Sequence, residues 1–89
     1  MRIFSYTGQF KRDIKNAEKR GKDMTKIKNV MQLLIDATPL PPALLDHPLR
    51  GKWQPSRELH IEPDWLLVYW IDDQEVRFER TGSHSDLFK

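Results

Sequence analysis

Three histidines are the residues of this chain best suited to acid–base chemistry, and all of them fall in its second half. His47, His60 and His84 stand in segments that also contain arginine or carboxylate side chains. An imidazole titrates close to neutral pH, so it can both accept and donate a proton there. An arginine fork matches the oxygens of a phosphate. Together these residue types predict acid–base work on an anionic substrate.

Cleavage of RNA through its own 2′-hydroxyl would use such a set. A base must take the hydroxyl proton, an acid must protonate the leaving 5′-oxygen, and cations must stabilise the charge on phosphorus. Asp64 and Arg80 could supply charges beside the histidines. Trp65 and Phe88 could offer faces on which a base stacks.

Each of these residues also has a structural interpretation. His60 could decorate the polar face of a half-exposed strand, and His47 before a proline could be a turn residue. Arg80 could pair with Asp64 for structure alone, and the aromatic residues are more often core than stacking platform. Spacing alone therefore leaves the catalytic and the structural interpretations open.

A metal site is the rival chemical interpretation. Three histidines and a carboxylate could bind zinc, but none of the spacings is a local pair such as H-x-x-x-H. Arg50 and Arg80 would also oppose a divalent cation. The chain has no cysteine, which excludes thiolate zinc sites and cysteine nucleophiles. The sequence thus favours metal-free catalysis, and no metal or other cofactor is expected.

The length and composition are those of a small globular protein. Eighty-nine residues predict a single domain over residues 1–89. No apolar run approaches the ~20 residues that cross a bilayer, and residues 1–6 lack the long apolar segment of a secretion signal. The absence of cysteine fits a reducing compartment. We expect a cytoplasmic protein without a membrane partner.

Basic residues are concentrated in the first third of the chain. Between Lys11 and Lys28, eight basic residues outnumber three acidic ones, a net charge of +5, whereas the remaining residues sum to −3. Such a block is the electrostatic footprint of a polyanion such as RNA, although a solvated, lysine-rich helix face explains it equally well. The eight basic residues are Lys11, Arg12, Lys15, Lys19, Arg20, Lys22, Lys26 and Lys28.

The first half of the chain predicts one strand and two helices. Residues 2–6 are rich in β-branched and aromatic side chains, as strands are. Thr7 and Asp23 can each cap a helix, and Gly21 can end the first one in a left-handed conformation. Apolar residues recur at helical spacing over 27–35. Two antiparallel helices joined by a tight turn are expected.

The second half predicts strands. Four prolines over 38–48 prevent a helix there. Residues 58–62 alternate, with Glu58 and His60 on the polar face. Residues 65–71 are apolar on both faces, as in a central strand. A hairpin turn and a last strand over 76–80 follow.

These elements predict an α+β fold in which a small antiparallel β-sheet carries the two N-terminal helices on one face. The prolyl segment or the C-terminal tail would cover the second face of the central strand. That arrangement brings His47 and His84 toward the strand bearing His60. Pairing about the hairpin sets Trp65 or a near neighbour roughly across from Arg80, which would place Arg80 close to Asp64.

The motifs resemble those of a known family, the YafQ-type toxins of bacterial toxin–antitoxin modules within the RelE/ParE superfamily. The resemblance runs along nearly the whole chain with little or no gap. The matching stretches are Lys22-Asp23-Met24, residues 46–53, residues 60–65, residues 77–84 and Leu87-Phe88.

The resemblance implies a ribosome-dependent mRNA endonuclease that cuts codons in the A site and is silenced by a DinJ- or RelB-like antitoxin. The basic helices would dock on ribosomal RNA. His84 is expected to act as general acid and Asp64 as general base. The family's acid–base set matches His47, His60, Asp64 and His84, and its substrate-contacting residues match Trp65, Arg80 and Phe88.

Two other functions stay open. A ParE-like inhibitor of DNA gyrase would share the fold and cleave nothing, so it would not need the histidines. A non-enzymatic nucleic-acid-binding module would depend on the basic helices alone.

Overall fold

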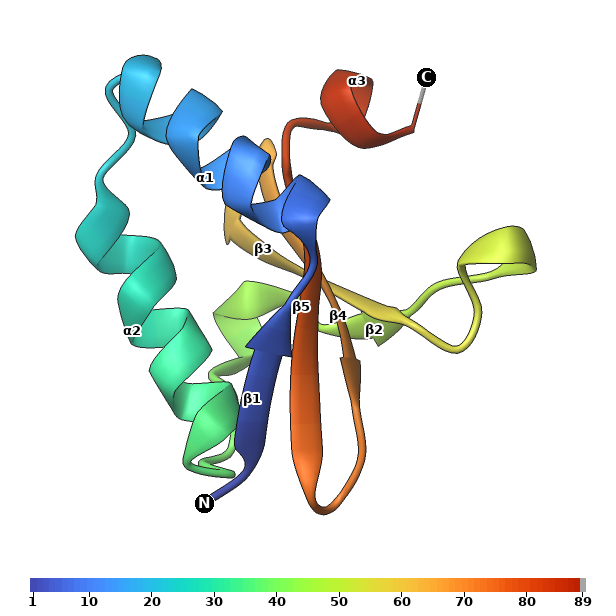
Figure 1. Cartoon of the computed structure of the whole chain (residues 1–89). Coiled ribbons are helices and arrows are strands. Elements are labelled where there is room, and N and C mark those ends of the chain that lie inside the picture. Colours follow the sequence, from blue (N-terminus) through green and yellow to red (C-terminus); the bar gives the residue numbers. More distant parts are fainter. Residues whose placement is uncertain (89) are drawn as a thin grey trace.

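A mixed β-sheet of five strands forms the centre of the molecule over residues 1–88, which are the residues that this computed structural model describes (Figure 1). Its spatial order is β1-β5-β4-β3-β2. The strands are β1 (Ile3–Tyr6), β2 (His47–Pro48), β3 (Arg57–Glu62), β4 (Trp65–Ile71) and β5 (Glu75–Gly82). The antiparallel pairing was expected correctly for β3, β4 and β5. It was wrong for β1, which pairs parallel with β5, and the short strand β2, which pairs antiparallel with β3, was not expected. The long stretch of chain between β1 and β5, which contains the helices and the other three strands, provides the connection that a parallel pair requires.

The two long helices are α1 (Gly8–Lys19) and α2 (Met24–Ile35). Their predicted caps are confirmed, because the Thr7 hydroxyl accepts from the Phe10 amide and the Asp23 carboxylate from the Thr25 amide. The helices diverge from the turn between them instead of running antiparallel (Figure 1). Each turns its apolar stripe toward the sheet rather than toward the other helix. Among the described residues, no helix is long and apolar enough to cross a membrane.

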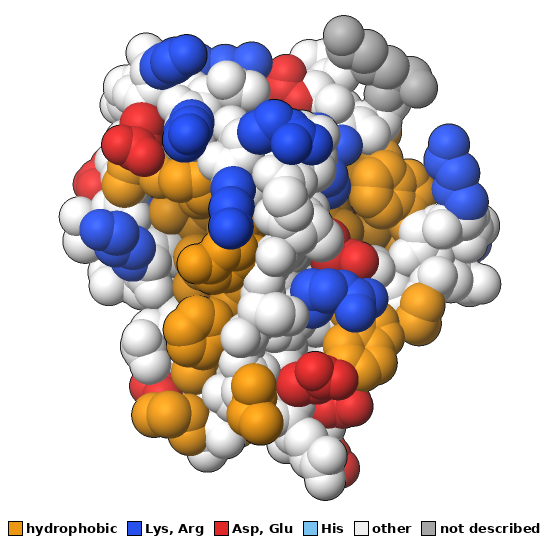
Figure 2. Space-filling view, viewed as in Figure 1, with side chains coloured by type: hydrophobic (Ala, Val, Ile, Leu, Met, Phe, Trp, Pro, Cys, Tyr) orange, Lys and Arg blue, Asp and Glu red, His pale blue; other side chains and the backbone are white. Residues whose placement is uncertain are grey.

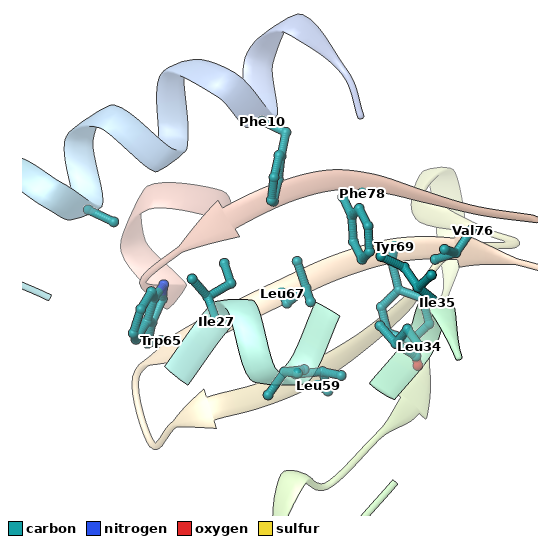
Figure 3. Close-up of a cluster of buried hydrophobic side chains, with 12 residues drawn as sticks. Phe10, Ile27, Leu34, Ile35, Leu59, Trp65, Leu67, Tyr69, Val76 and Phe78 are labelled. Carbon is teal, nitrogen blue, oxygen red and sulfur yellow. The ribbon is translucent and has the colours of Figure 1, made fainter. Parts of the chain in front are cut away.

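The larger core lies between these helices and one face of the sheet (Figure 3). Every second residue of β4 enters it, as the strand period requires. Its buried members are Phe10, Ala17, Ile27, Val30, Leu34, Ile35, Leu59, Trp65, Leu67, Tyr69, Val76 and Phe78.

A smaller core covers the second face of β4. Leu66 and Val68 pack there against Leu87, with Leu49 and Trp53 at the margin. Leu87 belongs to a short C-terminal helix, α3 (His84–Leu87), and Trp53 to the 3₁₀ turn η2 (Gly51–Trp53). The prediction that the tail covers part of this face is confirmed. The prolyl segment was the other candidate, but its Leu40 and Leu44, the latter in the 3₁₀ turn η1 (Pro42–Leu44), pack against the larger core.

An irregularity in β5 changes the predicted register. Tyr69 lies opposite Phe78, but Val68 lies opposite Arg80, so that Glu79 is an extra residue in the strand. Such a bulge shifts every later side chain by one position. Arg80 therefore lies across from Val68 instead of Leu67, three residues from Trp65, around which its partner was predicted.

Candidate active site

The three imidazoles form a row with His60 at its centre. The ring centroids of His47 and His60 are 6.1 Å apart, and those of His60 and His84 are 5.8 Å apart. His60 lies opposite Leu66, a member of the smaller core, so the row lies on the face of the sheet away from α1 and α2. The convergence expected from the sequence is thus observed, although three separate elements supply the residues.

Local structure fixes each of these positions. His47 lies on β2 directly opposite Glu58 of β3. His84 is the first residue of α3, which begins at Ser83 with a capping box completed by Asp86. In that motif the serine hydroxyl and the acidic side chain satisfy two backbone amides that would otherwise lack acceptors.

Asp64 is the hydrogen-bond acceptor for His84. Its Oδ1 lies 2.9 Å from the His84 backbone nitrogen and 2.6 Å from Nδ1 of the ring. These two hydrogen bonds, the backbone one first, lower the pKa of Asp64 below its ordinary value. A carboxylate that is already engaged and weakly basic is a poor proton acceptor. The structure therefore does not favour the general-base role that was expected of Asp64.

Glu58 is a member of the cluster that the sequence did not predict. It was expected on an exposed polar face, but it is only 5% exposed. Its Oε2 lies 3.0 Å from Nε2 of His47 and 4.0 Å from Nε2 of His60, and its Oε1 has no hydrogen-bond partner among the described residues. The alternation that places Glu58 on the same face as His60 was the available signal.

The ring of His47 lies between two acceptor groups. Its Nδ1 lies 2.8 Å from the Leu45 carbonyl oxygen, and its Nε2 lies 3.0 Å from Oε2 of Glu58. A neutral imidazole has only one N–H to donate, so a hydrogen bond to each acceptor at once would need one further proton. The geometry therefore places His47 and Glu58 where they can share a proton.

The same three residues have the spacing of a metal site. Ligand atoms of His47, Glu58 and His60 lie within 4.8 Å of one another. Two imidazoles and a carboxylate are a donor set that suits zinc or copper. No local spacing in the sequence predicts this set, because its ligands come from the two strands β2 and β3.

Arg80 is held by α1 rather than by Asp64. Its Nε lies 2.8 Å from Oδ2 of the buried Asp13, and its Nη2 lies 3.3 Å from Oδ1. Asp13 also accepts from the Thr81 amide at 3.1 Å. The expected pairing with Asp64 is thus wrong, although both residues line one cavity of about 420 Å³ between α1, β5 and α3.

The two aromatic residues expected at the substrate differ in their surroundings. Trp65 is 1% exposed, and its Nε1 donates to the Thr81 hydroxyl at 3.0 Å. It is a core residue, so the prediction that a base stacks on it is wrong. Phe88 is 36% exposed and lies edge-on to Trp53 at 5.2 Å between centroids. It keeps a surface on which a base can stack.

The predicted basic surface is partly neutralised. Arg20 pairs with Asp86 at 2.6 Å, while Lys22 and Lys26 pair with Glu62 at 3.1 and 2.9 Å. Figure 2 shows the lysine and arginine side chains spread over the outer surface of α1 and α2. Five members of the block are exposed without such a partner among the described residues: Lys11, Arg12, Lys15, Lys19 and Lys28.

Comparison with known proteins identifies the class. Residues 2–89 match the family model described as "Bacterial toxin of type II toxin-antitoxin system, YafQ". The chain is 52% identical to the mRNA interferase toxin YafQ of Escherichia coli strain K12, over 98% of this chain and 96% of that one.

Solved structures show the same similarity. The E. coli DinJ-YafQ toxin-antitoxin complex contains a chain that is 50% identical, with a TM-score of 0.92 over 99% of this chain and 98% of that one. A metal-bound toxin from Helicobacter pylori is 39% identical, with a TM-score of 0.91 over 99% and 100% of the two chains.

The fold and these matches define a bacterial toxin of the type II class. More narrowly, the chain belongs to the YafQ family. The expected α+β fold class, the expected family and the expected class of endoribonuclease toxin are thereby confirmed.

Proposed function

We propose that this chain acts in the cytoplasm as an mRNA interferase, cutting codons in the ribosomal A site by metal-free attack of the 2′-hydroxyl. The observation that supports this most directly is the row of three imidazoles with two carboxylates on one face of the sheet. Two proton-transfer groups and a cation are what this reaction needs.

His84 is the general acid. Its Nδ1–H donates to Asp64, so Nε2 is the ring atom left for the substrate. In the imidazolium form, Nε2–H protonates the leaving 5′-oxygen. Asp64 is a positioning residue that stabilises this charged form and fixes the orientation of the ring.

His60 is the general base in place of Asp64. Its Nδ1 faces the Pro63 carbonyl oxygen at 3.4 Å, which favours the tautomer with a free lone pair on Nε2. Nε2 accepts the 2′-hydroxyl proton, and the nearby Glu58 carboxylate stabilises the imidazolium that forms. His47 shares a proton with Glu58 and orients it.

Arg80 stabilises the charge on the scissile phosphate. Asp13 holds its Nε and Nη2, so the guanidinium is pre-oriented while its remaining N–H groups stay available. Phe88 provides the stacking surface for a neighbouring base.

The partners are the ribosome, mRNA and a cognate antitoxin. The exposed members of the basic block dock on ribosomal RNA through phosphate contacts. A DinJ-like antitoxin neutralises the toxin, as supported by the relative solved in a DinJ-YafQ complex.

The test is to express the chain under tight control and to map mRNA ends in arrested cells. New ends within codons, relieved by His84→Ala with the fold retained and by co-expression of the antitoxin, are expected. Absence of such ends would end the proposal. Arrest that survives loss of His47, His60 and His84 together would instead identify a ParE-like inhibitor of gyrase.

A further inference from the structure

A separate cavity of about 430 Å³ opens between the η2 loop and β5. Figure 2 shows basic, hydrophobic and acidic side chains around this hollow, on the side where the loop projects from the sheet in Figure 1. Its cationic lining residues are Lys52, Arg77 and Arg80, and its aromatic ones are Trp53 and Trp70. A volume of this order is within the range of small-ligand pockets. We call this cavity the η2 groove.

The η2 groove lies on the same face of the sheet as the histidine row. Trp70 follows Leu66 and Val68 at the strand period of two, so it points to the face of the smaller core. Trp53 packs against that core, and Arg77 lies opposite Trp70. The groove and the row are therefore parts of one surface.

Two connections join the groove to the candidate active site. The register aligns Glu58, Val68 and Arg80 across three neighbouring strands. Strands are ~4.8 Å apart, so the backbone at Arg80 is about 10 Å from that at Glu58. On the other side, Trp53 touches the ring of Phe88, whose backbone nitrogen donates to the His84 carbonyl at 2.8 Å. The η2 groove is thus adjacent to the histidine row.

The lining has the chemistry of a site for single-stranded RNA. The Arg77 guanidinium lies 5.3 Å above the Trp70 ring, and Arg77 and Lys52 are both exposed. Aromatic platforms beside a cationic track are what single-stranded nucleic acid binds. Glu79 also lies in the groove, where it accepts from the Ser56 hydroxyl and faces Arg77 at 3.5 Å. This carboxylate disfavours an anion in the interior, so the phosphate belongs at the rim and the base inside.

We propose that the η2 groove binds one nucleotide of the mRNA adjoining the scissile phosphate. Its base stacks beside Trp70 and Trp53, and its phosphate contacts Lys52 and Arg77. The assignment rests on the proposed function, because it is the substrate RNA that continues from the histidine row into the groove.

The experiment has two arms. The codon arm uses ribosomes that carry an uncleavable 2′-deoxy codon in the A site, and the other arm uses ribosomes whose mRNA ends before that site. Binding of labelled toxin is measured in a His84→Ala background, so that cleavage plays no part. The double variant Lys52→Gln/Arg77→Gln is expected to lose about ten- to thirtyfold in affinity in the codon arm only, because two phosphate contacts are removed. The matched control is Arg50→Gln, an exposed cation on the same loop that does not line the groove.

A stacking variant gives an independent readout. Trp70→Ala is expected to lose about tenfold in the codon arm, whereas Trp70→Phe keeps most of the affinity because it keeps a ring face. Thermal unfolding of each variant verifies that the fold is retained.

Three results would overturn the assignment. The groove variants could bind codon-carrying ribosomes as tightly as Arg50→Gln does, or the parent protein could bind both kinds of ribosome equally. An equal loss of affinity for both kinds of ribosome would instead identify ribosomal RNA as the occupant of the groove. The proposed function has its own separate readout. If the wild-type chain cleaves mRNA and the groove variants keep full affinity, only the RNA-binding role of the η2 groove is rejected. If binding depends on the codon but no cleavage occurs, only the endonuclease activity is rejected.

Discussion

One oxygen of Asp64 contacts His84 twice, at the backbone nitrogen and at Nδ1 of the ring. The contact joins the β3–β4 turn to the start of α3, and it leaves Nε2 as the reactive nitrogen. Asp64→Asn is expected to lower the rate of single-turnover cleavage about 10- to 100-fold, and His84→Ala about 10²- to 10⁴-fold. Ribosome affinity should change little in either variant. The control is Asp73→Asn in the exposed hairpin turn, and equal rates for the two asparagine variants would contradict the role of Asp64.

Replacing Glu58 is expected to affect the cleavage rate and the free energy of unfolding differently. It is a buried carboxylate with one oxygen that lacks a partner, which is a costly arrangement. Glu58→Gln should therefore leave the free energy of unfolding unchanged or raise it by about 1 kcal/mol, while lowering the cleavage rate about tenfold or more. Denaturant unfolding and single-turnover kinetics measure the two effects. Glu75→Gln, at an exposed position of β5, is the control.

The coupling of Glu58 to His47 can be measured in a double-mutant cycle. If the two side chains share a proton, the rate loss of His47→Ala/Glu58→Gln should be clearly smaller than the product of the single losses. Losses that simply multiply would show that the two residues act independently.

The pH dependence of stability follows from four carboxylates whose pKa values are lowered in the folded state. The pKa of Asp86 is lowered by Arg20 and then by the Ser83 amide, and that of Asp64 by His84. The pKa of Glu62 is lowered by Lys26 and then by Lys22, and that of Asp72 by the Gln74 amide and then by the Glu75 amide. A lowered folded-state pKa means that the stabilisation is present above the unfolded value, near pH 4, and is lost as pH falls toward the folded value.

The melting temperature should accordingly be steady between pH 5 and 7 and fall below about pH 4. Asp86→Asn should flatten this acid decline and lower the melting temperature near pH 7, since it removes the Arg20 pair. Thermal unfolding across the pH range provides the measurement. If the melting temperature of Asp86→Asn falls as steeply in acid as that of the parent protein, groups other than Asp86 cause the decline.

Metal binding at His47, Glu58 and His60 should inhibit the enzyme rather than support it. A bound Zn²⁺ or Cu²⁺ would occupy the lone pair that the general base needs. A chelator selective for transition metals is expected to leave cleavage unchanged, and added Zn²⁺ is expected to inhibit. Calorimetry should show a site that is lost in His60→Ala. Activity that the chelator abolishes and Zn²⁺ restores would contradict the metal-free mechanism.

Asp13 supports Arg80 from the interior of the protein. Because it is buried and accepts from the guanidinium and from the Thr81 amide, Asp13→Ala leaves these donors without their acceptor. The free energy of unfolding should fall by about 2–4 kcal/mol. The exposed Glu18→Ala on the same helix should change it by less than about 0.5 kcal/mol. Equal effects in chemical denaturation would reject this role.

Features of the fold that depend on neighbouring residues could be predicted from the sequence. The caps at Thr7 and Asp23 involve hydrogen bonds across two or three residues, and the double apolar pattern of β4 already indicated a covered second face. The convergence of the histidines could be predicted as well. His47 and His60 lie on neighbouring strands, and His84 follows the last strand in the tail.

Features that depend on distant register could not be predicted in the same way. The bulge at Glu79 moves Arg80 by one position, and its partner Asp13 is 67 residues away. Glu58 has β2 paired beside it and the His47 side chain against its carboxylate, and the strand alternation does not reveal these neighbours. Trp65 enters the core because its strand is central, and the family motif marks its position without indicating its burial.

Cleavage of mRNA on the ribosome with His84 as the acid can be tested on purified components. The protein is incubated with ribosomes that carry a defined codon in the A site, and the RNA ends are mapped. We predict a single cut within that codon, none in the same RNA without ribosomes, and a rate at least about 10²-fold lower for His84→Ala. No cut in the A-site codon, or equal cutting by His84→Ala, would rule out this mechanism.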